Sequence, residues 1–174
     1  GETKMSQFVI AFLGLFFITT LTYSQGPADE KRLDEIAERG AHVMPFDLEK
    51  TLHIFSKTNH GGIQQVIVKD KSDTEQINLI RSHLSKIAAE FKRSNFSNPE
   101  KIHGKNMPGL ADLKAAKDGQ IKISYKELPD GAEITYSTEI QKLKNAIHQW
   151  FEAQLSDHAQ HAVPGHEHNF EHHH

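Results

Sequence analysis

The sequence predicts an α+β domain in which two ββα units form a four-stranded antiparallel sheet with two long helices on one face. Two stretches of alternating apolar and polar residues contain glycine turns, and each stretch is followed by a helical apolar stripe. The chain has 174 residues, a formal net charge of −3, 13 histidines and no cysteine. The lack of cysteine excludes disulfides, thiolate zinc fingers and iron–sulfur clusters, so we expect the apolar core alone to stabilise the fold.

The N-terminal segment has the pattern of a secretory signal peptide. Lys4 precedes a 14-residue apolar run that begins at Phe8, which is shorter than the roughly 20 residues that span a membrane. We therefore expect a signal peptide over residues 1–24, with residues 1–4 preceding the natural start at Met5. The protein is then expected to be periplasmic or secreted. A buried core helix and a retained membrane anchor are the alternatives.

A linker and a charged helix are predicted in residues 25–40, ahead of a single domain over 41–160. The helix is expected over 28–39, with Gly40 as its C-cap.

The first ββα unit begins with a hairpin over residues 51–69, which turns at Asn59–Gly62 because glycine tolerates the positive φ that tight hairpin turns need. Ser72 and Glu75 have the spacing of a capping box at the start of a helix. That helix is predicted by apolar residues at steps of three and four: Ile77, Ile80, Leu84, Ile87 and Phe91.

The second unit repeats this order. Short helices are expected before it, one capped by Asn98 and one over 110–117. A second hairpin spans 121–136 with its turn at Leu128–Gly131, and Thr138–Gln141 has the spacing of a second capping box. The last helix carries the stripe Ile140, Leu143, Ile147, Trp150 and Phe151.

Residues 161–174 are predicted to form a disordered, histidine-rich tail. Such a tail binds Zn, Cu or Ni weakly. Its last three residues, 172–174, are either native or part of a purification tag.

Ordered motifs lie along the domain: GAHVMPFDLEKT at 40–51 with His53 and Phe55, IHG at 102–104, MPGL at 107–110, LPDGA at 128–132 and QLSDH at 154–158. Together they resemble a family of small exported bacterial proteins that is often labelled aspartate carbamoyltransferase. The resemblance implies an exported bacterial protein. The Ser-Thr-Arg-Thr phosphate loop of true carbamoyltransferases does not occur in the chain, so we do not expect carbamoyl transfer.

Two His/Met pairs are the main candidates for a metal site. His42 and Met44 are two residues apart beside Pro45, and His103 and Met107 are four apart beside Pro108. Imidazole and thioether together suit copper, and imidazole also suits zinc. The alternative is that both methionines fill the core and the histidines make ordinary hydrogen bonds.

Three more histidines complete the predicted metal-ligand set. His53 lies on a strand with Phe55, and a histidine in that position is either a packed core residue or a third ligand. His158 and His161 are three residues apart and would share an ion if the last helix continued, and Asp157 could orient one of them. The predicted ligands are His42, Met44, His53, His103, Met107, His158 and His161.

Catalytic motifs are absent from the sequence. It contains no Gly-x-Ser-x-Gly, His-Glu-x-x-His, phosphate loop or dinucleotide fingerprint, and its weak negative charge argues against nucleic-acid binding. We therefore predict an exported, non-enzymatic domain that binds Cu or Zn, touches a membrane only during export, and has no partner or oligomeric state that the sequence specifies. The alternatives are a metal-free binding module that uses the exposed sheet face, and a small enzyme that uses His53 or His148.

Overall fold

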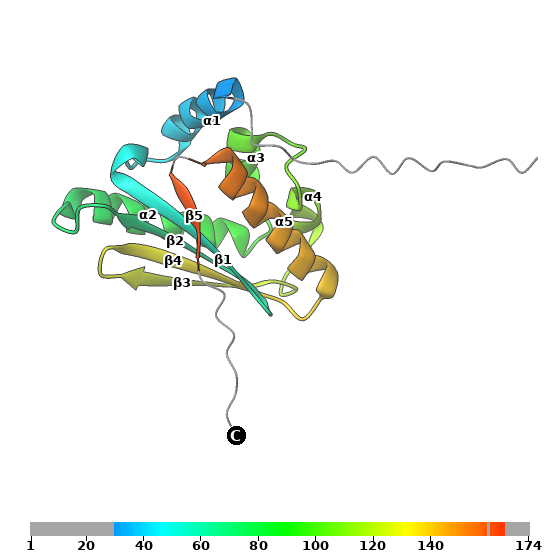
Figure 1. The fold of residues 1–174 in the computed structure, drawn as a ribbon. Coiled ribbons are helices and arrows are strands. Elements are labelled where there is room, and N and C mark those ends of the chain that lie inside the picture. Colours follow the sequence, from blue (N-terminus) through cyan, green and yellow to red (C-terminus); the bar gives the residue numbers. More distant parts are fainter. Residues whose placement is uncertain (1–29, 160, 166–174) are drawn as a thin grey trace, which may run out of the picture.

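The computed structural model describes residues 30–159 and 161–165, and it confirms the α+β class. The helices lie together on one side of a single sheet (Figure 1). The elements in chain order are α1 (Glu30–Val43), a short 3-10 helix (Leu48–Lys50), β1 (Thr51–Thr58), β2 (Gly61–Val68), α2 (Thr74–Phe91), α3 (Ser97–His103), α4 (Leu110–Ala115), β3 (Lys122–Leu128), β4 (Gly131–Ser137), α5 (Gln141–Asp157) and β5 (Ala162–Pro164).

The sheet has five strands in the order β3-β4-β2-β1-β5. Both predicted hairpins are present as β1–β2 and β3–β4, and β2 pairs antiparallel with β4 to join them. The sheet is nevertheless mixed, because β5 adds to the edge of β1 in parallel, with Ile54 opposite Val163. The expectation of a tail that is disordered from residue 161 is wrong at 162–164, where the backbone pairs with β1; residues 166–174 lie outside the described residues, as does the predicted signal peptide.

One face of the sheet is covered by helices and the other is open. Side chains on the covered face are buried because successive strand residues point to opposite sides. The buried strand residues include His53, Phe55, Gln64, Val66, Ile123, Ala132, Ile134 and Tyr136. Most open-face residues of the same strands alternate with them and are partly or fully exposed.

Trp150 of α5 is at the centre of the core, only 1% exposed. Its ring makes edge-to-face contacts with Phe91, Phe96 and Tyr136, at centroid separations of 5.6–5.8 Å. Phe151 continues this cluster to Phe55 of β1, at 5.1 Å. The predicted stripes therefore pack both long helices on the sheet.

Three predicted helix caps differ from the structure. The N-cap of α2 is Asp73, whose carboxylate accepts the Gln76 N–H, because Ser72 is already bonded to Asp70. Helix α5 begins after Ile140 without a side-chain cap. The N-cap of α3 is Phe96, and Asn98 lies within the helix.

Gly40 was expected to end the first helix, but α1 continues through it to Val43. A Cβ at Gly40 would lie 2.9 Å from the Met44 Cε, so the small residue lets the end of the helix pack closely on its own following turn. Within the described ranges, no helix is both long and apolar enough to cross a membrane.

Candidate histidine site

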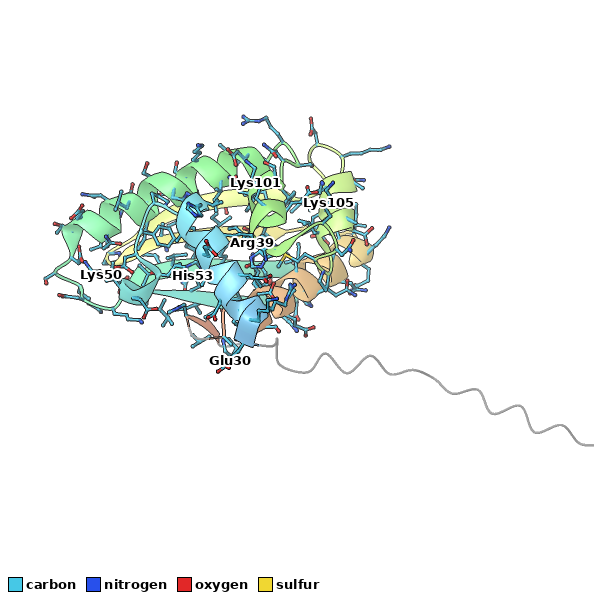
Figure 2. The ribbon with its side chains drawn as sticks, turned by 90° about the horizontal axis from the view of Figure 1, so that it is seen from above. Glu30, Arg39, Lys50, His53, Lys101 and Lys105 are labelled. Atoms are coloured by element: carbon cyan, nitrogen blue, oxygen red, sulfur yellow. The ribbon has the colours of Figure 1, made fainter. Side chains whose placement is uncertain are left out.

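Four histidines lie close together: His53 contacts His158, His158 contacts His103, and His161 lies beside His158. Figure 2 shows helix α1 over the end of the sheet that carries His53. His53 is on the covered face of β1, His103 ends α3, His158 follows α5, and His161 precedes β5. The first three are 5–6% exposed. Histidine is seldom buried this completely, so each ring needs polar partners or a ligand.

Arg32, Asp157, His103 and His158 form a continuous polar chain. The Arg32 guanidinium donates to both Asp157 carboxylate oxygens, at 3.2 and 3.0 Å. The His103 Nδ1 lies 2.8 Å from Asp157 Oδ2, and the His103 Nε2 lies 3.2 Å from the His158 Nε2. Since the carboxylate can only accept, His103 Nδ1 donates to it, and in the neutral form of His103 the Nε2 atom then accepts from the His158 N–H.

Burial and hydrogen bonding together set the charge states of Asp157 and His158. Burial raises the pKa of the Asp157 carboxyl, but hydrogen bonds from His103 and Arg32 outweigh it, and the net pKa is lowered. Burial lowers the pKa of His158 to about 2, and repulsion from His103 and His53 adds to this. Asp157 is therefore ionised and His158 neutral near pH 7, and a neutral imidazole is the form that binds a metal ion.

His53 stacks on His158, with ring centroids 5.7 Å apart and an interplanar angle of 24°. Burial lowers its pKa to about 4, and repulsion from His161, His83 and His103 contributes. Its Nε2 is buried without a hydrogen-bond partner among the described residues. His53 is thus a neutral imidazole with an unused nitrogen beside the His103–His158 pair.

His161 is brought to the same place by the parallel β1–β5 pairing. Its carbonyl accepts the backbone N–H of His53 at 2.8 Å. Its Nε2 lies 3.1 Å from a Glu49 carboxylate oxygen, while its Nδ1 is buried and has no partner in the described part of the chain. His161 is therefore a second ring with an unused nitrogen.

The other predicted ligands lie elsewhere or face the core. His42 is exposed on α1 in a shallow hollow beside Glu35 and Arg39, and no hydrogen bond, ion pair or ring contact of the described residues joins it to the four buried histidines. Met44 and Met107 are core residues, 7% and 5% exposed. Across residues 30–159 and 161–165, no three His, Cys, Asp or Glu side chains are already arranged around one point as a metal site.

The polar chain also contains a residue that the sequence did not predict, Arg32, and it gives Asp157 a different role. Asp157 orients His103 from α3, not the neighbouring His158 or His161. The predicted sharing of an ion along a continued helix does not apply, because α5 ends at Asp157 and His158 is its C-cap. Neighbouring residues on a helix point in different directions, so the side chain of Asp157 does not reach the ring of His158 that follows it. Asp157 instead contacts His103 and Arg32.

His148 has contacts that indicate a structural role. Its Nε2 lies 3.1 Å from the Thr58 carbonyl oxygen and 2.8 Å from that of Gly61, so the ring N–H ties α5 to the β1–β2 turn. We expect His148→Ala to lower the free energy of unfolding by about 1 kcal/mol, the usual net value of such a hydrogen bond. Urea unfolding followed by circular dichroism measures it, and an unchanged midpoint would show that the contact adds nothing.

Comparison with known proteins assigns no family to this chain. No protein-family model matches it, and searches of curated proteins and of solved structures find no match. The resemblance to small exported bacterial proteins remains a prediction from the sequence.

Proposed function

We propose that this exported domain binds one Zn or Cu ion through the imidazoles of His103 and His158. The observation that supports this most directly is the 3.2 Å separation of their Nε2 atoms. A tetrahedral ion with zinc–nitrogen bonds of about 2.0–2.1 Å holds two nitrogens about 3.3–3.4 Å apart. The distance between the two nitrogens therefore matches that of two ligands on one ion.

The surroundings of His103 fit the same role. Imidazoles that bind metals usually donate their other N–H to a carboxylate, which orients the ring and makes it a better ligand. Asp157 accepts that hydrogen bond here, and Arg32 holds the carboxylate from its outer side. This arrangement leaves the His103 Nε2 lone pair directed at His158.

Further donors are available next to the pair. His53 and His161 each have a buried nitrogen without a partner in the described structure, and the ring of His53 already stacks on His158. Since three donors do not yet surround one point, the proposal includes a rotation of His53 or His161 toward the ion. Imidazole donors select Zn or Cu over Mg or Ca.

The location and the non-enzymatic character are part of the same proposal. The predicted signal peptide supports a domain that works outside the cytoplasm. The contacts of His148 with backbone carbonyl oxygens make the proposed enzyme alternative less favourable, because that ring is already used to hold a turn.

The test is metal loading of a full-length chain in which the five tail histidines (His166, His168, His172, His173 and His174) are replaced by glutamine. We expect one Zn or Cu per chain by elemental analysis after dialysis. Binding through Nε2 should move the proton of the neutral His158 ring to Nδ1 without releasing it, so calorimetry in buffers of different ionisation enthalpy should detect no proton release from this ring.

Single substitutions test which histidines bind the ion. His103→Gln or His158→Gln should lower the affinity for the metal ion by more than about 100-fold. Loss of a residue that only orients a ligand costs about 10–100-fold, and each of these substitutions removes a ligand itself. The matched controls are His42→Gln and His60→Gln, which are exposed and should retain full binding. Loss of binding in His42→Gln, or no ion in the parent chain, would contradict the proposal.

The metal-free alternative is a binding module that uses the open sheet face. Its support is a group of partly exposed apolar residues on β1, β2 and β5: Leu52, Ile54, Ile63, Ile67 and Val163. Strand register places several of them side by side, with Leu52 opposite Ile67 and Ile54 opposite Val163. A parent chain that takes up no ion would favour this alternative.

A further inference from the structure

A cavity of about 50 Å³ lies between the sheet and the helices, separate from the space between His103 and His158. Residues from β1, β2, α2, α3 and α5 line it, and its walls include Val66, Leu84 and Ile87. A single water molecule needs about 10–15 Å³ of such volume, so the cavity has room for a molecule of a few heavy atoms.

The lining of this cavity carries no Asp, Glu, Lys or Arg side chain. Its only titratable members are His53 and His83. A charged ligand would find no counter-charge here, so the lining fits an uncharged one.

Trp150 supplies a polar group that has no partner. Its Nε1 is buried without a hydrogen bond in the described part of the chain, and the residue lines the cavity. An indole N–H is a donor only, so its partner must be an acceptor. Gln64 also lines the cavity, but its Oε1 already accepts from the Tyr136 hydroxyl at 2.7 Å.

We infer that this cavity binds a small uncharged molecule whose carbonyl oxygen accepts a hydrogen bond from the Trp150 indole. Mostly apolar walls with a small number of placed polar groups are the usual composition of a small-molecule site. Val43, His83 and Asn98 are the partly exposed lining residues, so the entrance lies between α1, α2 and α3. The inference does not depend on metal binding at the four histidines, and metal-free protein is used to test it.

The test uses acetone as the probe and the indole N–H of Trp150 as the reporter. Trp150 is the only tryptophan in the chain, so a ¹⁵N-labelled full-length sample gives a single indole resonance. Titration should move its proton downfield along a saturable curve with a millimolar dissociation constant, as expected for a ligand of a few heavy atoms. A shift that stays linear up to molar acetone would mean that the cavity takes up water only, and would overturn the inference.

A variant with a narrower cavity tests whether acetone binds inside the cavity or elsewhere on the protein. Val43→Phe places a larger side chain on the wall and should weaken acetone binding at least tenfold. The matched control is Val163→Phe, at an exposed position on β5 that does not line the cavity, and it should bind as the parent does. The remaining amide resonances report whether each variant is folded, and equal binding by both variants would overturn the inference.

Discussion

Acidification from pH 6.5 to pH 4 should remove about 3 kcal/mol or more from the free energy of unfolding of the metal-free domain. His53 has an ordinary pKa of 6.5 when the chain is unfolded and about 4 when it is buried in the fold. One pKa unit corresponds to about 1.4 kcal/mol, so His53 alone accounts for about 3 kcal/mol. His158 acts in the same direction, since its pKa falls to about 2.

The sign follows from proton binding. Between pH 6.5 and 4 the unfolded chain binds protons on these histidines and the folded chain does not, so stability is complete above pH 6.5 and falls as the pH decreases. Asp157 contributes in a different window. Its pKa is lowered in the fold, so its contribution is lost only at pH values below the ordinary pKa of 3.8.

Urea unfolding at a series of pH values measures this effect. The slope of the free energy of unfolding against pH counts the protons that the unfolded chain binds and the folded chain does not. His53→Gln should reduce that slope between pH 6.5 and 4 by about one proton, because glutamine does not titrate. His60→Gln is the control, since His60 is exposed on the β1–β2 turn and should leave the profile unchanged. A parent domain with equal stability at pH 6.5 and 4 would show that the buried rings are not held neutral.

Asp157→Ala should destabilise the domain by about 3 kcal/mol. The substitution leaves the buried His103 Nδ1–H without its acceptor, which costs about 1–3 kcal/mol, and it also removes the carboxylate that pairs with Arg32. Arg32→Ala should cost no more than about 1 kcal/mol, because its side chain is 47% exposed and solvent weakens the ion pair. Equal costs for the two variants would show that the bond between Asp157 and His103 is not the main contributor.

Asp157→Asn separates the orienting role of this residue from its charge. The asparagine oxygen can still accept from His103 Nδ1–H, so stability should fall less than in Asp157→Ala. The affinity for Zn should nevertheless fall about 10–100-fold, because the ligand loses its carboxylate partner. Calorimetry with the tail-substituted chain measures this, and an unchanged affinity would remove Asp157 from the proposed site.

The sequence predicts most of this fold because its patterns are local. Hairpin turns at Asn59–Gly62 and Leu128–Gly131 and the stripes of α2 and α5 depend on neighbours within a few residues, and all of them are present in the structure. Strand β5 could not be predicted in this way. It has three residues, one of them proline, and it forms only because the edge of β1 is available to it.

The candidate site was predicted only in part, for the same reason. The sequence singled out His53, His103, His158 and His161, but it paired His103 with Met107 through their spacing of four residues. In the structure, tertiary contacts decide the partners, and His103 at the end of α3 meets Asp157 at the end of α5, which is 54 residues away. The Arg32 contact spans 125 residues, and no local pattern indicates it.

Because β5 pairs with β1, the histidine site combines residues that are synthesised early with residues that are synthesised late. His53 is among the first residues of the folded domain to be synthesised, whereas His158 and His161 are among the last. The two hairpins and α2 are therefore synthesised before His158 and His161. The proposed ion site needs His158, so a chain that stops before the end of α5 would lack one of its two main ligands.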